Sequence, residues 1–307
     1  MPALQETTFS TYNAAQGKHY ALARPDYHPS VYGYIVETHT STGGQLDTLV
    51  DLGCGPGNCA RSLAPHFAHV LGIDPAPGMI ATAKELGGKT ASGTPIQYGQ
   101  GSASTFGKEG DLLIEDGTVD LIAVGNAAHW FDMQTFWQRS ASILRSGGSV
   151  AIWTTGELRV HPESRCCEAV QAAMDTFFER DIEPYMNEGN RVVRNKYLDL
   201  LLPWTVPDPV ACFPQTKFVR RDWTVGESFV TQGDPEIDMD KLEKMMSTSS
   251  PYTRWCEAHP GDVETENNIL RKLRREVERI LQGDGVVPGE ERIKGLALGA
   301  VLIVKKI

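Results

Sequence analysis

Residues 49–57 read Leu-Val-Asp-Leu-Gly-Cys-Gly-Pro-Gly, and this stretch decides the fold. A short apolar run reaches Asp51, and glycines follow at positions 53, 55 and 57. Glycine adopts positive φ without steric cost and lets a ligand approach bare backbone. A helix that starts after such a turn presents free N–H groups and the positive end of its dipole to polar ligand atoms. The stretch therefore predicts a strand, a glycine elbow and a helix around a nucleotide-type ligand.

The spacing of the glycines separates two kinds of nucleotide ligand. The dinucleotide fingerprint Gly-x-Gly-x-x-Gly needs a third glycine, and counted from Gly53 that position is Asn58. NAD is therefore not expected. The pattern present, Asp-x-Gly-x-Gly-x-Gly, resembles motif I of the class I S-adenosylmethionine (SAM) methyltransferases. The resemblance implies that SAM is bound and S-adenosylhomocysteine released. It places the acid near the amino-acid end of SAM and the glycines along its methionine and ribose, so we expect these residues to bind the cofactor: Asp51, Gly53, Cys54 and Gly55.

A second acid follows at a spacing that fits one intervening helix. The apolar residues 70–73 lead into Asp74, 21 positions after Gly53. This spacing predicts the end of a second parallel strand. A carboxylate there can accept hydrogen bonds from both ribose hydroxyls, so we expect Asp74 to bind the ribose. Pro75 and Met79 lie at the start of the next helix, and we expect them to bind the cofactor as well.

Three further apolar segments, 96–100, 119–124 and 149–153, bring the strand signals to five, alternating with helical segments. This alternation predicts a doubly wound, mostly parallel sheet, in which ligands bind beyond the carboxyl ends of the strands. In the family the loop after the third strand commonly carries an acid for the adenine, but Ser102 and Ala103 stand there. We expect backbone N–H groups or Ser102 to bind the adenine in place of that acid. Asn126 and Ala127 follow the fourth strand at the same edge, and we expect them to bind the cofactor.

Two segments narrow the resemblance. Residues 20–29, Tyr-Ala-Leu-Ala-Arg-Pro-Asp-Tyr-His-Pro, and residues 128–132, Ala-His-Trp-Phe-Asp, resemble segments of trans-aconitate methyltransferase-like proteins. The resemblance implies a seven-stranded Rossmann-like sheet with a helical cap. It also leads us to expect that Tyr20 and Arg24 bind the cofactor, while His129 and Trp130 meet the methyl acceptor.

The resemblance implies methyl transfer to an oxygen of a small molecule, with a carboxylate as the first choice of acceptor. A carboxylic acid has a pKa near ~4 and is already an anionic nucleophile at neutral pH. In-line alignment could then supply most of the rate, since effective molarities reach ~10⁵ M or more. An anionic acceptor needs cationic anchors, and the planar fork of arginine suits a carboxylate. The predicted anchors are Arg159, Arg194 and Arg254.

His129 is the predicted catalytic residue, and its role depends on the acceptor. A carboxylate would be positioned by a hydrogen bond from His129. A hydroxyl or amine of a secondary metabolite would need His129 as its base, which an imidazole pKa near ~6.5 allows. A structural role for residues 129–131 in the pocket floor stays open. So does a SAM-binding protein of this fold that uses its cap for binding or catalyses another reaction.

At 307 residues the chain is long enough for an α/β core and a cap. The stretches 166–178, 195–202 and 264–282 predict helices, and 218–223 and 296–304 predict strands six and seven. We expect N-terminal lid helices in 1–40, the SAM-binding core in 41–155, a helical cap insertion in 156–210, and the last strands with more cap and an amphipathic helix in 211–307.

Charge and cysteine content limit the partners. A net charge of −10 argues against a nucleic-acid substrate, which would need clustered basic residues. The sequence contains no apolar stretch of 18 residues, so it does not predict a membrane span. The six cysteines form no Cys-x-x-Cys pair, so no metal is expected, and a reducing cytoplasmic compartment fits. The expected partner is a small anionic acceptor, and the expected state is a monomer or homodimer.

Overall fold

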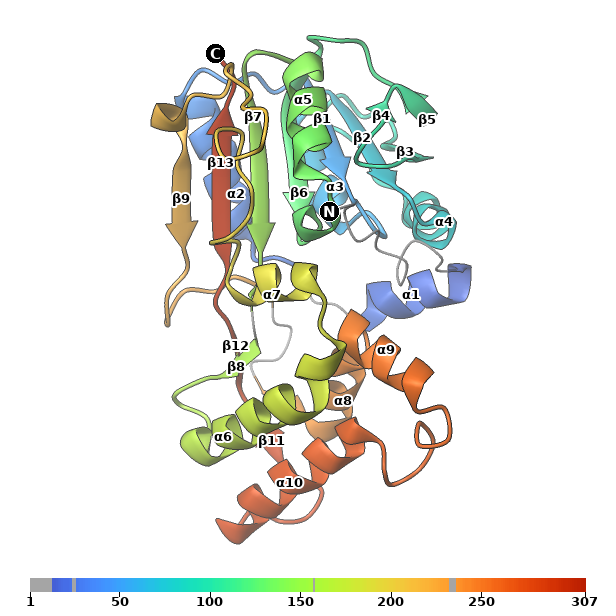
Figure 1. The fold of residues 1–307 in the computed structure, drawn as a ribbon, viewed down its shortest axis with the longest axis vertical. Helices are drawn as coiled ribbons and strands as arrows, with labels where there is room; N and C mark the ends of the chain where they lie inside the picture. The colour runs from blue at the N-terminus through green and yellow to red at the C-terminus, as the bar shows by residue number, and fades with distance from the viewer. Residues whose placement is uncertain (1–12, 24–25, 157, 232–235) are drawn as a thin grey trace.

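A seven-stranded sheet forms the centre of the molecule, in the order β3-β2-β1-β6-β7-β13-β9 (Figure 1). The computed structural model describes residues 13–23, 26–156, 158–231 and 236–307. The first five strands pair in parallel, and β13 runs antiparallel to both β7 and β9. This topology confirms the predicted doubly wound, mostly parallel sheet. The strands are β1 (Thr48–Leu52), β2 (His69–Asp74), β3 (Gln97–Gln100), β6 (Val119–Gly125), β7 (Leu144–Thr154), β9 (Val219–Asp222) and β13 (Ala300–Lys305).

The two faces of the sheet carry separate apolar cores, because side chains alternate along each strand. Val50 and Ile122 point into one core, whereas Leu49 and Leu121 point into the other. Burial on both faces explains why these strands read as continuous apolar runs. The helices of one face are α2 (Pro29–Ser41), α3 (Asn58–Leu63) and α4 (Pro77–Leu86), and α5 (Met133–Ile143) covers the other.

A helical cap lies beyond the carboxyl ends of the parallel strands (Figure 1). It has its own apolar core, in which Val170 and Met174 meet Val277 and Leu281. Two distant parts of the chain build it, and they are joined by the short strand pair of β8 (Leu158–Val160) and β12 (Gly295–Ala297). A second short pair, β10 (Ile237–Asp238) with β11 (Arg292–Ile293), lies within the C-terminal part. The helices of the cap are α6 (Cys167–Phe177), α7 (Glu188–Arg194), α8 (Met239–Met246), α9 (Ser250–Ala258) and α10 (Ile269–Gly283).

The remaining elements are short. Helix α1 (Ala14–Ala23) lies beside α4 (Figure 1). Strands β4 (Phe106–Gly107) and β5 (Glu109–Leu113) form a small separate pair. Single helical turns cover Ala64–His66, Ala128–Trp130, Phe178–Ile182, Glu183–Tyr185 and Gln215–Lys217. Within the described ranges, no helix combines the length and apolar character needed to cross a membrane.

Two local predictions were wrong. Residues 195–202 are not a helix, because α7 ends at Arg194 and the chain turns through Lys196 and Tyr197, both in the left-handed region. The predicted final strand 296–304 is two strands, since β12 pairs within the cap before β13 enters the sheet. The amphipathic helix is confirmed as α10, which begins after Asn268, whose side chain accepts a hydrogen bond from the Leu270 N–H.

Candidate active site

The glycine elbow joins β1 to α3 and is tied to the end of β2. The N–H groups of Gly53 and Cys54 both donate to the carbonyl of Ile73, at 2.8 and 3.1 Å. Gly53 has φ +70°, and an ideal Cβ built on it would lie 2.6 Å from the Ala127 Cβ. Gly55 also has positive φ, but an ideal Cβ there meets nothing within 4 Å. The elbow is thus packed against the end of β6 at Gly53 and leaves bare backbone beside open space at Gly55.

Two buried carboxyl groups hold the elbow in shape. Asp51 accepts a hydrogen bond from the Ala60 N–H at 2.8 Å, and Asp74 accepts from Gly55 and Ala76, each at 2.9 Å. Burial raises the pKa of Asp51 to about 7, and the nearby charge of Asp74 adds to the rise. Burial also raises the pKa of Asp74 to about 6, against the effect of its two N–H donors. Asp51 therefore supports the first turn of α3, and Asp74 links the elbow to β2.

The other predicted cofactor residues are spread around this edge. Asn126 is half-buried and Ala127 buried at the end of β6. Pro75 is exposed, the side chain of Met79 is buried, and Tyr20 is half-buried on α1. Ser102 is exposed, with its hydroxyl 3.0 Å from that of Thr105, and Ala103 is half-buried. Cys54 belongs to the apolar core, where burial raises the pKa of its thiol. Arg24 lies outside the described residues.

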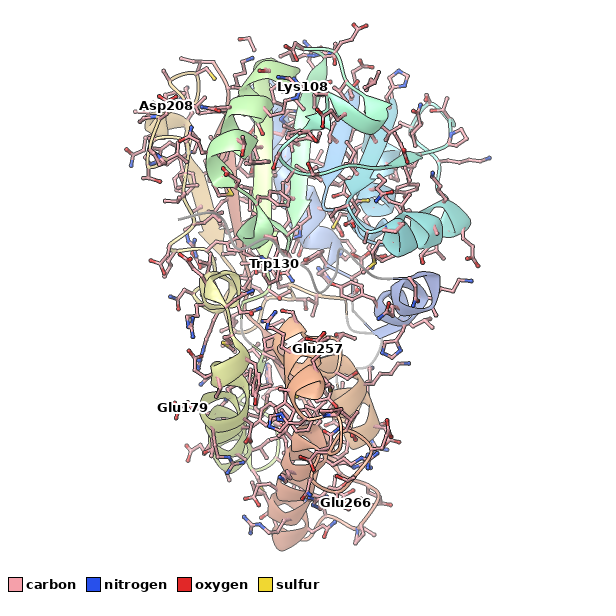
Figure 2. The ribbon with its side chains drawn as sticks, turned by 45° about the vertical axis from the view of Figure 1, so that its right-hand side comes forward. Lys108, Trp130, Glu179, Asp208, Glu257 and Glu266 are labelled. Atoms are coloured by element: carbon pink, nitrogen blue, oxygen red, sulfur yellow. The ribbon has the colours of Figure 1, made fainter. Side chains whose placement is uncertain are left out.

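His129 lies in the helical turn that follows β6, next to the elbow. Its Nδ1 is 2.7 Å from the hydroxyl of Tyr197, and its ring centroid is 4.4 Å from that of Trp130. Helix α7 of the cap packs on this turn, because an ideal Cβ on Gly189 would lie 2.8 Å from the His129 carbonyl oxygen. Figure 2 shows Trp130 at the level where sheet and cap meet. The turn is therefore a junction between the elbow and the cap.

The three predicted anchors are engaged by groups of the cap. Arg159 pairs with Asp175 at 3.1 Å. Arg194 lies 3.6 Å from a carboxylate oxygen of Glu183. Arg254 donates to the Tyr185 carbonyl at 2.8 Å and to the side chain of Asn190. These contacts tie β8 to α6, α7 to the turn Glu183–Tyr185, and α9 to that turn and to α7.

Comparison with known proteins identifies the chain. Residues 50–152 match the family model described as a methyltransferase domain. The methyltransferase cfoB of Aspergillus candidus is 30% identical over 304 residues, which cover 90% of this chain and 92% of that protein. The chain is a class I SAM-dependent methyltransferase.

Further similarities extend over most of this methyltransferase. The probable S-adenosylmethionine-dependent methyltransferase CRG1 of Saccharomyces cerevisiae is 24% identical over 267 residues, covering 84% of this chain and 87% of that protein. A solved structure from Anaeromyxobacter dehalogenans, assigned as a type II methyltransferase, superposes with a TM-score of 0.61 at 18% identity, covering 92% and 97% of the two chains. The latter shows a shared fold.

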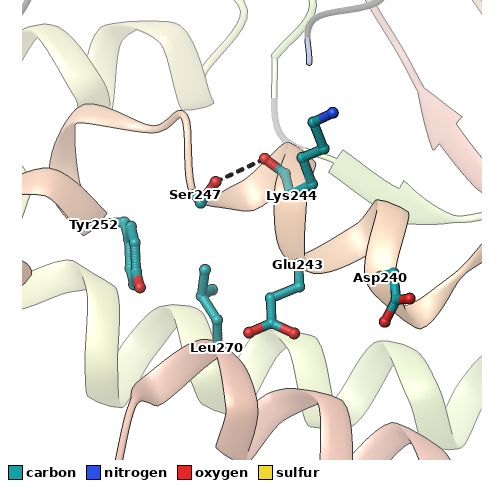
Figure 3. Close-up of a pocket in the computed structure, with 6 residues that line it drawn as sticks. All are labelled: Asp240, Glu243, Lys244, Ser247, Tyr252 and Leu270. Carbon is teal, nitrogen blue, oxygen red and sulfur yellow. Dashed lines mark hydrogen bonds between the residues drawn. The ribbon is translucent and has the colours of Figure 1, made fainter. Parts of the chain in front are cut away.

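A cavity of about 320 Å³ opens on the cap of the methyltransferase, between α8, α9 and α10 (Figure 3). It does not include the elbow or His129, and Glu243 on its wall pairs with Arg274 at 3.4 Å. Its lining acids thus help to join α8 to α10. The lining residues are Asp240, Glu243, Lys244, Ser247, Tyr252 and Leu270.

Sequence reasoning missed two residues of the candidate site, Tyr197 and Thr154, which lie beside His129 and Asn126. Tyr197 is 1% exposed and lies 68 positions after His129. Thr154, at the end of β7, donates to the Asn126 side chain at 2.8 Å. No local motif marks either residue, because their neighbours come from other elements. One signal was available for Thr154. It directly follows the apolar run 149–153, the fifth predicted strand, and therefore lies at the edge of the sheet where ligands bind.

Replacing Arg254 tests whether it is structural. We expect Arg254→Ala to lower the free energy of unfolding by about 1–3 kcal/mol, because the Tyr185 carbonyl and Asn190 lose a charged donor. Arg279→Ala, which breaks an exposed pair with Glu276 on α10, should cause no measurable loss. Denaturant unfolding measures both. An unchanged stability for Arg254→Ala with a loss of acceptor binding would instead support the anchoring role.

Proposed function

We propose that this methyltransferase methylates a hydroxyl oxygen of a small organic molecule, with His129 as the base. The observation that carries the proposal is the 2.7 Å contact of His129 Nδ1 with the buried Tyr197 hydroxyl, on a turn between elbow and cap. A phenol or alcohol is uncharged at neutral pH, since even a phenol has a pKa near ~10. Methylation of such an acceptor is faster when a base within hydrogen-bond distance removes its proton.

The elbow has the features that SAM requires. It offers bare backbone beside open space at Gly55 and a buried carboxylate, Asp74, at the end of β2. We propose that Asp74 accepts hydrogen bonds from the ribose hydroxyls, that Gly53 and Gly55 border the methionine, and that Ser102 and Ala103 border the adenine. When bound, SAM supplies a methyl group on a positively charged sulfur. The protein's part is to align the acceptor oxygen and to remove its proton.

A carboxylate acceptor is the second candidate. The likeness of residues 128–132 to trans-aconitate methyltransferase-like proteins favours it. Against it, each arginine expected to hold an anion already has at least one polar contact within the cap: Arg159, Arg194 and Arg254. Freeing one of them would break an existing interaction, so the hydroxyl acceptor comes first.

A panel of acceptors distinguishes the two candidates. The protein would be incubated with methyl-labelled SAM and with phenols, aliphatic alcohols, and di- and tricarboxylic acids in separate reactions. We expect labelled methyl ethers from the hydroxyl compounds. Methyl esters alone would assign the carboxylate function. SAM that binds without turnover in every reaction would contradict both.

The pH dependence of SAM binding tests the proposed role of Asp74. The ionised carboxylate is the better acceptor, so SAM affinity should fall below pH about 6, by up to ~10-fold per pH unit. Stability without ligand should change in the opposite sense. Because the pKa of Asp74 is raised in the folded state, that state binds more protons than the unfolded chain between pH ~4 and about 6, and this contribution to stability falls as pH rises.

Calorimetric titrations with SAM from pH 5 to 8 measure the effect. Asp74→Asn should bind more weakly and with a flatter pH profile. Asp222→Asn is the matched control, because Asp222 is paired with Arg220 on β9 and is not part of the elbow. An unchanged slope in Asp74→Asn would show that another group, such as Asp51 with its pKa of about 7, governs the dependence.

A further inference from the structure

An arginine of α3 spans the glycine elbow, and we call the three residues of this bridge the Arg61 clamp: Arg61, Pro56 and Asn58. One guanidinium nitrogen, Nη1, donates to the Pro56 carbonyl at 2.7 Å, and the other, Nη2, donates to the Asn58 side-chain oxygen at 2.6 Å. Pro56 and Asn58 flank Gly57, the last glycine of the elbow. One side chain therefore holds both sides of the turn from which α3 begins.

The clamp gives a role to the residue that breaks the dinucleotide fingerprint. Asn58 occupies the position of the third glycine of that fingerprint, where a bare Cα allows close packing of helix on strand. Here it is the first residue of α3 and half-buried, and its side chain accepts from Arg61. The direction of both bonds is fixed, because a guanidinium has donors only and each partner is a carbonyl-type oxygen. The departure from the fingerprint thus supplies one of the two acceptors of the clamp.

The elbow needs such a bridge because its glycines have many conformations to lose. Gly55 and Gly57 have φ of +53° and +84°, values that glycine adopts readily among many others. On the side of β3, the ring of Tyr98 fills the space beside Gly57, where an ideal Cβ would lie 2.6 Å from the phenol oxygen. On the side of α3, Arg61 fixes the Pro56 carbonyl between the two glycines. The turn is therefore held from both sides in one conformation.

The arginine of the clamp is itself fixed in place. Arg61 is half-buried, and its backbone N–H donates to the Gly57 carbonyl at 3.0 Å in the first turn of α3. Its aliphatic stem packs on Gly88, which follows α4, because an ideal Cβ on Gly88 would lie 3.0 Å from the Arg61 Cγ. A side chain that folding already orders costs no further entropy when a ligand binds.

We propose that Arg61 is a positioning residue that holds the elbow in the conformation that binds SAM. The proposal rests on the proposed function only in placing SAM at the elbow. Arg61 acts through the backbone of the elbow, since a turn that is already formed binds its ligand without the cost of ordering it. Loss of the clamp should therefore weaken SAM binding and leave the methyl-transfer step unchanged.

Calorimetric titration with SAM tests the clamp without any methyl acceptor. We expect Arg61→Ala to weaken SAM binding by about 10- to 100-fold, the equivalent of losing hydrogen bonds from a charged donor. Asn58→Ala removes one acceptor and leaves Arg61 in place, so it should weaken binding by about three- to tenfold. It serves as the test if Arg61→Ala does not fold. Arg61→Lys keeps the charge without the planar fork, and its affinity should lie between those of Arg61→Ala and the wild type.

Arg145→Ala is the matched control. Arg145 also donates to a backbone carbonyl and to a side-chain amide oxygen, those of Thr118 at 2.7 Å and Gln45 at 3.2 Å, but it lies at the start of β7, the opposite end of the sheet from the elbow. Denaturant unfolding should show a loss of stability in both arginine variants, whereas SAM affinity should fall only in Arg61→Ala. With an acceptor from the panel, Arg61→Ala should raise KM for SAM and keep kcat within about twofold at saturating SAM.

Two results overturn the clamp. Wild-type SAM affinity in Arg61→Ala would show that the elbow keeps its shape without the bridge, and wild-type affinity in Arg61→Lys would show that charge alone suffices. Gly53→Ala then separates failure of the clamp from failure of the cofactor site. If Gly53→Ala weakens SAM binding, the elbow remains the cofactor site and only the clamp fails. If neither Gly53→Ala nor Arg61→Ala weakens it, the placement of SAM at the elbow fails as well.

Discussion

Gly53→Ala is expected to weaken SAM binding by about thirtyfold or more. The residue has φ +70°, where an alanine costs about 1–2 kcal/mol, and its new methyl group would lie 2.6 Å from the Ala127 Cβ. Overpacking of this kind costs a further ~1–3 kcal/mol. Together these costs shift the equilibrium for forming the elbow by roughly thirtyfold to a few thousandfold, since 1.4 kcal/mol is tenfold. Calorimetric titration with SAM measures the loss.

Gly33→Ala is the matched control. Gly33 lies in α2, and an ideal Cβ there meets nothing within 4 Å. The substitution should leave SAM affinity unchanged and stabilise the helix by about 0.5–1 kcal/mol, the usual cost of a helical glycine relative to alanine. If Gly53→Ala binds SAM as tightly as the wild type, Ala127 has moved aside and the elbow is not constrained as described.

The sheet could be predicted from the sequence because its signals are local. The apolar runs that lead to Asp51 and Asp74, and the glycines between them, identified β1, the elbow and β2 without knowledge of distant contacts. The turn at Lys196 and Tyr197 could not be predicted in this way. Its residues read as a helix, but in the fold they are left-handed and contact α7 and His129 in the turn after β6.

The partners of the charged residues could not be predicted from the sequence either, as the arginines show. An arginine in a sequence is compatible with a substrate pocket or an ion pair until its neighbours are known. Asp175 lies 16 positions from Arg159, and Glu183 lies 11 positions from Arg194. The first pair forms because β8 packs on α6, and the second because α7 folds back on the turn Glu183–Tyr185. Tyr185, whose carbonyl receives Arg254, is 69 positions away. Because these arginines are already paired within the cap, we place a hydroxyl acceptor ahead of the carboxylate that the sequence favoured.

Replacement of His129 should have the largest effect on turnover. We expect His129→Ala to lower kcat by about 10²–10⁴-fold, the contribution of a general base, while KM for SAM stays within about threefold. The reason is that His129 is held through Tyr197 on the turn after β6, apart from the carboxylates that shape the elbow. Stopped-time assays with labelled SAM and the hydroxyl acceptor measure both constants. Added imidazole should restore part of the rate.

His69→Ala is the control for loss of a histidine, because His69 begins β2 with its side chain 60% exposed. It should leave kcat unchanged. A smaller loss of kcat in His129→Ala would be expected if the acceptor is a carboxylate. A carboxylate needs no deprotonation at neutral pH, so its methylation could lose only the positioning contribution, about tenfold or less. A loss of that size without rescue by imidazole would contradict the base role and favour an acceptor that is already anionic.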